Sequence, residues 1–302
     1  EFPFVVLPDF ETLGQGVRAQ SGIEVFSFAP YVWPDQVSAW LNFSHANADW
    51  WIEQSRATVA ASIANADQNL AVSVSDYLPG PISPVIFDAG EDTVPHPFYA
   101  PIWQQSPPPF ANWVVNFDWL SISLHLLALD AMVELRHAVL TVVHDLSYIG
   151  DSGLNQKDHE AYHASLVNWQ KEGTNTTWEH PHCVLQEPVF REVNNEASDI
   201  VGHVEASIAW DAYLVGLLPE GVRGITVVLE NSCGQAFSYD LDGNSAFYRG
   251  SGDFHDPSFD KMVKSVPFYD FQDVERATET KGHCLYSFLI YPTREFEDEY
   301  RS

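Results

Sequence analysis

Positively charged residues are scarce in this sequence. Its 302 residues include 14 Lys and Arg against 42 Asp and Glu, which gives a formal net charge of −28 at pH 7. A chain with this charge repels phosphate backbones and anionic membranes, so we exclude nucleic acid as a partner. Long-range attraction favours a cationic or zwitterionic ligand instead.

Cysteine is equally rare. Cys183, Cys233 and Cys284 are too few for a disulfide scaffold and do not have the spacing of a zinc finger. Cys233 follows the apolar run 225–229 and Cys284 opens the run 285–291, so these two form a bridge if the runs are neighbouring strands. The long loop so closed would contribute roughly 3 to 4 kcal/mol to stability. Reduced thiols in a core are the alternative, and the pairing of Cys183 stays open.

Long apolar runs are missing as well. No run reaches the roughly 18 residues of a membrane-spanning helix. The most lipophilic segment, 120–129, contains His125 and is followed by Asp130. The sequence starts at Glu1 rather than Met and shows no signal peptide, so we expect an excised or processed piece of a longer protein.

Two glycosylation acceptors agree with an oxidising, extracellular compartment. They are Asn42, in Asn-Phe-Ser, and Asn175, in Asn-Thr-Thr. An acidic composition also keeps a secreted or surface-displayed protein soluble.

Hydrophobic periodicity predicts alternating helices and strands. The predicted helices are 8–22, 35–64 with a break near Asn47, 124–138 with an open end that reaches to 143, 155–169 and 209–218. The predicted strands are 23–32, 82–87, 98–105, 113–117, 189–193, 200–207, 225–230, 237–241, 246–248 and 285–291. Asp242-Gly243 is the expected turn of a hairpin. This order is typical of an α+β fold with a mostly antiparallel sheet.

The stretch 82–121 carries an unusual mixture of aromatic, amide and carboxylate side chains. They are Trp103, Gln104, Gln105, Trp113, Asn116, Asp118 and Trp119. Such a mixture lines pockets for small polar ligands. The tryptophans are also ordinary core residues, and the polar groups also serve to satisfy buried backbone, so both interpretations remain open here.

Several short segments, in the same order along nearly the whole chain, resemble one protein family. The matching segments are Ala29-Pro30-Tyr31-Val32, Trp40, Trp51-Ile52, 99–107 (YAPIWQQSP), Asn116-Phe117-Asp118, Val139-Leu140-Thr141, Glu187-Pro188-Val189-Phe190, Val201-Gly202, Trp210-Asp211, Leu217-Leu218-Pro219 and 252–256 (GDFHD). With them, the sequence resembles the extracellular sensor region of receptor-type nucleotide cyclases of diatoms and related microalgae, which is similar to the CHASE domain.

The resemblance implies a PAS-like fold of the CHASE or Cache type, with antiparallel sheets, flanking helices and a lead-in helix. Residues 1–150 would form a membrane-distal sensing half, 151–185 an insertion of helix and loop, and 186–302 a membrane-proximal half. The chain itself would not be an enzyme. Flanking transmembrane helices would anchor a homodimeric parent on the outer side of the plasma membrane and connect it to a cytoplasmic adenylate or guanylate cyclase.

The resemblance also places a ligand pocket on the central sheet. Gln105 stands where related sensors carry an acidic contact, and Thr141 stands where they carry a pocket hydroxyl. The ligand would be a small polar extracellular molecule, and no cofactor is expected. The predicted binding residues are Tyr31, Trp103, Gln105, Asn116, Asp118 and Thr141.

A motif of another class competes with this interpretation. His159-Glu160-Ala161-Tyr162-His163 matches H-E-x-x-H, in which two histidines on one helix face bind zinc and the glutamate acts as general base. This would make the protein a secreted zinc metalloprotease-like hydrolase. No third ligand stands at the usual spacing, so His180, His182 or Cys183 would have to supply one from a folded-back loop. An adhesive extracellular module is a further alternative.

Overall fold

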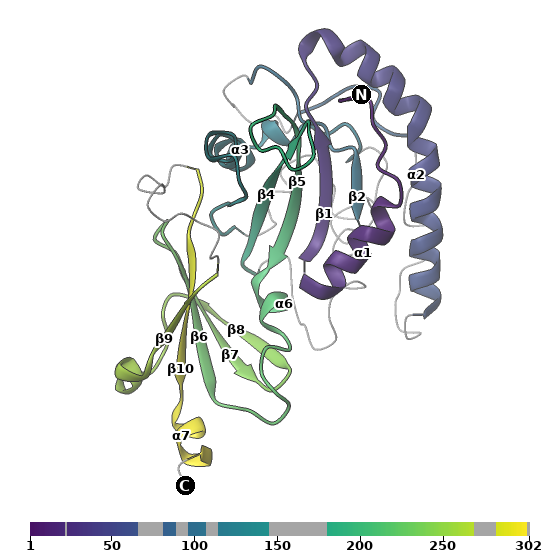
Figure 1. The fold of residues 1–302 in the computed structure, drawn as a ribbon. Helices are drawn as coiled ribbons and strands as arrows, with labels where there is room; N and C mark the ends of the chain where they lie inside the picture. The colour runs from purple at the N-terminus through teal and green to yellow at the C-terminus, as the bar shows by residue number, and fades with distance from the viewer. Residues whose placement is uncertain are drawn as a thin grey trace.

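The computed structural model describes residues 1–21, 23–65, 81–88, 96–106, 114–144, 180–268 and 282–300. These residues form helices and two five-stranded antiparallel sheets, one above the other in Figure 1. The prediction of an α+β fold with antiparallel sheets is therefore confirmed. The N-terminus lies beside the upper sheet, and the C-terminus lies below the lower one (Figure 1).

The first sheet has the strand order β2-β1-β5-β4-β3. Its strands are β1 (Ile23–Pro30), β2 (Gln104–Ser106), β3 (Val139–Leu140), β4 (His182–Phe190) and β5 (Ile200–Ala209). The predicted boundary at 186 falls inside β4. Both strands of the β4–β5 hairpin belong to the first sheet, because β5 pairs with β1 along most of its length.

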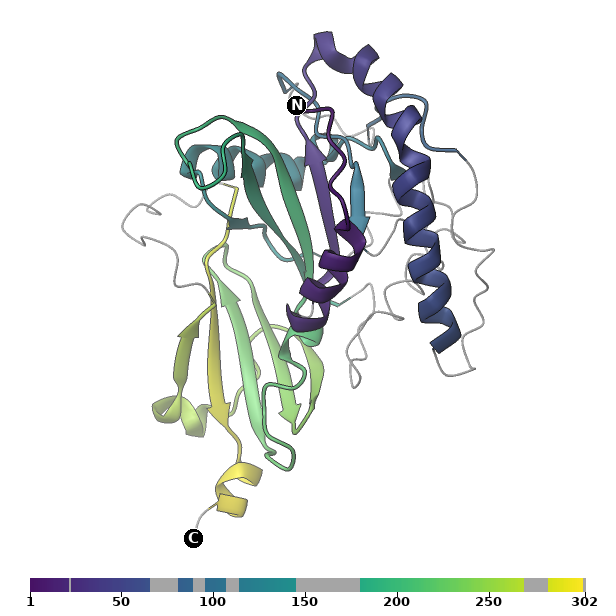
Figure 2. The ribbon, with the colours of Figure 1, turned by 45° about the vertical axis from the view of Figure 1, so that its right-hand side comes forward.

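Helices cover both faces of this sheet. They are α1 (Phe10–Ser21), η1 (Pro34–Gln36), α2 (Val37–Asn65), η4 (Trp119–Ser121) and α3 (Ser123–Leu135). Neighbouring residues of β1 point to opposite faces: Phe28 packs with Trp40 of α2, whereas Ala29 packs with Leu129 of α3. Figure 2 shows α1 and α2 on one side of the sheet and α3 on the other.

The predicted break in the second helix is wrong, since α2 runs through Asn47 without interruption. Asn47 donates from Nδ2 to the carbonyl of Phe43 at 2.8 Å, and Ser44 donates to that of Leu41 at 3.1 Å. These side chains bond within the helix instead of ending it. Burial of Trp51 on the same helix outweighs the poor helix propensity of this segment.

The predicted helix 124–138 does not extend to residue 143. α3 ends at Leu135, and Arg136 adopts a left-handed conformation with φ 58° while its N–H bonds to the carbonyl of Met132. This cap turns the chain, so Val139 and Leu140 enter the sheet as β3.

Most of the stretch 82–121 is not strand in its described part. Only β2 is a strand there, and single bridges join Val32 to Tyr99, Phe87 to Phe117 and Pro101 to Asp118. Prolines have no N–H to donate, which limits ladder formation in this segment.

The second sheet has the order β8-β7-β6-β10-β9. Its strands are β6 (Ile225–Asn231), β7 (Ala236–Asp242), β8 (Ser245–Ser251), β9 (Lys264–Pro267) and β10 (Tyr286–Pro292). The helical segments around it are α6 (Trp210–Leu214), η5 (Pro257–Met262) and α7 (Arg294–Tyr300). The predicted hairpin is confirmed, and Gly243 takes φ 55° at its turn. The predicted helix 209–218 is shorter, because Val215 is already extended.

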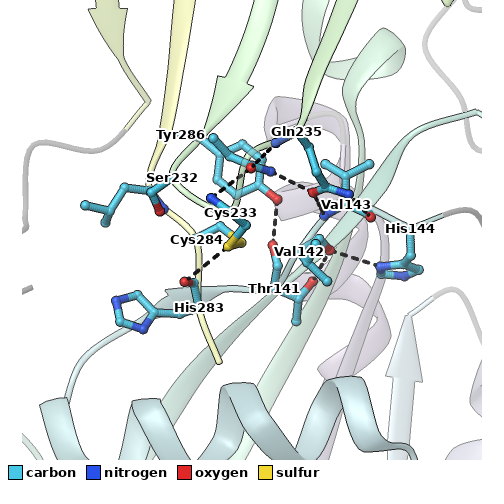
Figure 3. Close-up of a disulfide and its surroundings, with 12 residues drawn as sticks. Thr141, Val142, Val143, His144, Ser232, Cys233, Gln235, His283, Cys284 and Tyr286 are labelled. Atoms are coloured by element: carbon cyan, nitrogen blue, oxygen red, sulfur yellow. Dashed lines mark hydrogen bonds between the residues drawn. A yellow bond between two sulfur atoms is a disulfide. The ribbon is translucent and has the colours of Figure 1, made fainter. Parts of the chain in front are cut away.

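The expected disulfide is present between Cys233 and Cys284, and Cys183 is a buried free thiol. The bridge lies where the second sheet meets the segment that contains β3. Cys284 N donates to Leu140 O at 2.8 Å, and Gln235 both donates to Val143 O and accepts from Val143 N at 2.8 Å (Figure 3). We call residues 140–143, with the groups that hold them, the joint.

Candidate functional site

A pocket of about 510 Å³ opens at the end of the first sheet that lies away from the joint. It is bordered by the first residues of the chain, the β1–α2 connection, the end of α3 and the β4–β5 hairpin. We call it the tip pocket. Its volume is within the roughly 300 to 1,000 Å³ that is usual for small-molecule sites.

Aromatic side chains form one wall of the tip pocket. Tyr31 and Phe98 stack with their ring centroids 4.1 Å apart, and Trp33 meets Phe98 edge-on at 5.4 Å. Tyr31 is buried, whereas Trp33 is 48% exposed at the rim. This wall offers apolar contact area to the body of a small molecule.

Two arginines at the rim are bonded within the protein. Arg136 donates from Nε to Glu196 O at 2.7 Å and from Nη2 to Ser198 O. Arg191 pairs with Asp199 at 3.3 Å. All of these partners belong to the β4–β5 hairpin. Arg136, which follows α3, therefore holds the hairpin against the end of that helix, whereas Arg191 forms its ion pair within the hairpin.

Behind Tyr31, a row of polar side chains crosses the face of the first sheet that α3 covers. Gln105, Ser27, Glu205 and Gln186 stand opposite one another on β2, β1, β5 and β4. All four are buried. His203, two residues before Glu205, lies on the same face.

His125 of α3 contacts this row from the helix that covers the sheet face, and Trp119 stacks on its ring with the centroids 4.5 Å apart. We call Ser27, Tyr31, His125, Gln186, His203 and Glu205 the polar layer.

Glu205 is the centre of the polar layer. Its Oε1 lies 3.1 Å from Nδ1 of His125 and 3.3 Å from Nε2 of His203, and it accepts from Nε2 of Gln186 at 2.6 Å. Burial by itself raises the pKa of Glu205, but the two imidazoles lower it more, to about 2. The carboxylate is therefore ionised although it is buried.

Several buried atoms of the polar layer have no hydrogen-bond partner among the described residues. They are Ser27 Oγ, Tyr31 Oη, Gln186 Oε1, His203 Nδ1 and Glu205 Oε2. Buried polar atoms are nearly always hydrogen-bonded, since leaving one without a partner is costly. The polar layer therefore concentrates unmet hydrogen-bonding capacity on one face of the first sheet.

Tyr31 connects the two parts of the site. Its side chain lines the tip pocket, and its hydroxyl belongs to the polar layer. Burial raises the pKa of Tyr31, and the negative charge of Glu205 raises it further. The tip pocket and the polar layer are thus neighbours, with the Tyr31 ring between them.

Three of the six predicted binding residues lie at this site or beside it. Tyr31 lies in the tip pocket and the polar layer, and Gln105 stands opposite Ser27 in the row of polar side chains that crosses the sheet. Asp118 lies beside this site. Burial raises the pKa of its carboxyl group, and His203 is close enough to oppose this rise. Its Oδ1 also accepts from the N–H groups of Ala100 and Leu120 at 2.9 and 3.2 Å.

Trp103 and Asn116 lie on the α2 side of the sheet instead. Trp103 donates to Val5 O at 2.7 Å and packs against Trp40 and Trp51. Asn116 accepts from Trp40 Nε1 at 2.9 Å and donates to the carbonyl of Ser83 at 3.0 Å. Both side chains are bonded in a core.

Thr141 lies in the joint and not in the polar layer. Its hydroxyl accepts from Val184 N at 2.9 Å, and its carbonyl accepts from the Tyr286 hydroxyl at 2.5 Å (Figure 3). The six predicted residues therefore do not converge on one pocket.

Other predicted positions lie outside the described residues: Trp113, His159, His163 and Asn175. Asn42 is exposed on α2. Within the part of the chain that the structure describes, no group of three or more His, Cys, Asp or Glu is placed to hold a metal ion. None of the described helices has the length and apolar character needed to cross a membrane.

The central residues of the polar layer were not predicted from the sequence. His203, Glu205 and Ser207 alternate with apolar residues along β5, and such alternation is typical of a strand with one face in water. Only the packing of α3 shows that this polar face is buried. The unusual number of histidines near predicted strands was the one available signal.

Comparisons with known proteins give this chain no family. Neither the models of known protein families nor the curated proteins include a match for it.

Proposed function

We propose that this chain is the extracellular ligand-sensing region of a membrane-anchored, homodimeric receptor nucleotide cyclase. A small polar molecule enters at the tip pocket and binds the polar layer of the first sheet. The observation that carries the proposal is the polar layer itself. Behind the aromatic wall of a small-molecule-sized pocket, it contains five buried polar atoms that have no hydrogen-bond partner among the described residues.

The fold supports this proposal in its coarse features. A five-stranded antiparallel sheet with helices on both faces, preceded by a lead-in helix, is what a PAS-like sensor domain would present. The Cys233–Cys284 disulfide fits an extracellular location, because such bonds persist in oxidising compartments.

The joint gives the proposal a route for the signal. β3 pairs with β4, which carries Gln186 of the polar layer, and the residues after β3 are bonded to the second sheet. A ligand that shifts β4 would therefore act on the second sheet through β3 and through the hydrogen bonds that Cys284 and the Gln235 side chain make to residues 140 and 143.

Thermal unfolding with a library of small polar metabolites tests the proposal. We expect at least one compound to raise the melting temperature of the wild-type chain. The Tyr31→Phe variant should bind that compound about fivefold more weakly, since it loses one hydrogen bond.

Tyr239→Phe is the matched control for this experiment. Tyr239 is also buried with a hydroxyl that has no partner among the described residues, but it lies in the second sheet. If no compound shifts the melting temperature, or if both variants weaken binding equally, the site does not sense a ligand.

A further inference from the structure

We propose that the ligand of the polar layer is a small amine, whose ammonium group donates hydrogen bonds to Glu205 Oε2 and Gln186 Oε1. This inference rests on the proposed function and adds the chemical class of the molecule.

The inventory of donors and acceptors in the polar layer supports this class. Two of the unpartnered atoms can accept hydrogen bonds but cannot donate them. They are the amide oxygen Gln186 Oε1 and, because Glu205 is ionised, its carboxylate oxygen Oε2. The unpartnered hydroxyls of Ser27 and Tyr31 can donate or accept, and none of the unpartnered atoms of the described residues belongs to a lysine or arginine, the side chains that can only donate. A bound group must therefore bring donors of its own.

The charge distribution favours an ammonium over a neutral donor. The three contacts that described residues make to the Glu205 carboxylate all use Oε1, so within the described part of the chain the second oxygen of this ionised, buried group is left for a charge-assisted bond. The net charge of −28 also attracts cations from a distance.

An acidic ligand head fits the site poorly. The arginines at the rim already hold carbonyl oxygens and the Asp199 carboxylate. A ligand carboxylate that passed them would meet the like charge of Glu205.

The aromatic wall suits the rest of such a molecule. Tyr31, Trp33 and Phe98 offer contact to an apolar body, and aromatic faces attract a nearby cation. Tyr31 connects this wall to Glu205, because its ring lines the tip pocket and its hydroxyl lies among the buried polar atoms of the polar layer.

Calorimetric titration at pH 7 with matched compounds tests the class. We use a panel of primary amines, each paired with the alcohol and the carboxylate of the same carbon skeleton, such as 2-phenylethylamine, 2-phenylethanol and phenylacetate. At least one amine should bind, with an affinity about 10- to 100-fold above that of its alcohol. The Glu205→Gln variant should lose most of this preference.

Glu24→Gln is the matched control. Glu24 is a buried carboxylate of β1 that pairs with His182 at 3.0 Å, away from the polar layer. It should leave amine affinity within about threefold of wild type, since no charge-assisted bond to the ligand is lost. If Glu205→Gln does not fold, Gln186→Met removes the second acceptor and replaces it in the test.

The outcomes separate the two proposals. The inference is overturned if the alcohol binds as tightly as its amine, if the preference for the amine survives Glu205→Gln, or if only non-amine library compounds bind. In each of these cases the proposed ligand-sensing function remains. If no compound of any class binds, the proposed function itself fails.

Discussion

At the scale of single residues, two buried carboxyl groups respond to their surroundings in opposite ways. Glu205 keeps its charge because His125 and His203 lower its pKa to about 2. For Glu11, burial is the larger effect and raises the pKa to about 7, although Arg18 lies 3.2 Å away and acts in the other direction. The two groups should leave opposite signatures in the pH dependence of stability.

Glu205 should stabilise the fold above pH 4.5, the value for an ordinary glutamate. A folded-state pKa below the unfolded one gives stability that is lost as the pH falls from 4.5 toward 2. Between these values the wild type should lose about 3 kcal/mol of unfolding free energy relative to Glu205→Gln. Urea unfolding at several pH values measures this, and parallel curves would contradict the assigned contacts between Glu205 and the two imidazoles.

Glu11 should do the reverse. Its raised pKa gives stability that is fully present below pH 4.5 and disappears as the pH rises through about 7. Glu11→Gln should therefore flatten the fall in unfolding free energy across this window, by about 1 to 3 kcal/mol. Thermal unfolding from pH 4.5 to 8 tests it, and Glu134→Gln, on the exposed surface of α3, is the control for replacing a glutamate outside the core.

At the scale of secondary-structure elements, the joint is the connection that matters for signalling. Gln235 is held in the turn after β6, where Asn231 donates to its Oε1 at 2.8 Å. Its amide therefore bonds Val143 as a neighbouring strand would. The disulfide connects this turn to the segment before β10 (Figure 3). It therefore links the two groups that bond residues 140–143, Gln235 in the turn and the Cys284 backbone.

Gln235→Ala should loosen the joint without unfolding the sheets. The loss of two hydrogen bonds to buried backbone groups should cost about 1 to 3 kcal/mol. Hydrogen exchange at the Val143 amide should speed up, while exchange at β1 amides stays at the wild-type rate. Uniform acceleration in both sheets would mean that the residue acts on global stability alone.

Removal of the disulfide should act on the same region more strongly. Its cysteines are 51 residues apart, so the chain-entropy model gives about 4 kcal/mol for the bridge. The Cys233→Ser, Cys284→Ser double variant should lower the unfolding free energy by about this amount. An unchanged free energy under oxidising conditions would show that the bridge does not form in solution.

At the scale of the whole molecule, the charge of −28 is the dominant feature. Self-repulsion opposes compactness, and added salt screens it. We expect the melting temperature to rise when NaCl increases from about 20 to 200 mM, where the Debye length falls well below the size of the molecule. An equal rise with uncharged sucrose alone would point to exclusion from the surface rather than to screening.

Much of the fold was predictable because it depends on local pattern. The helix before β1, the strands β5, β6 and β10 and the β7–β8 hairpin follow from apolar periodicity and turn residues. The disulfide followed from the positions of Cys233 and Cys284 beside two apolar runs. The site was predictable only at Tyr31 and, next to it, Gln105 and Asp118. Trp103 and Asn116 carry side chains that suit a pocket or a core equally well.

The sequence by itself determined the acidic charge, the α+β class and which residues alternate along each strand, because these depend on composition and on neighbours in the chain. Only the tertiary structure decided that Gln105, Ser27, Glu205 and Gln186 stand in one row, since strand order and register join segments far apart in the chain. The same packing buries this row under α3. Alternation along a strand tells which residues share a face, but not what covers that face.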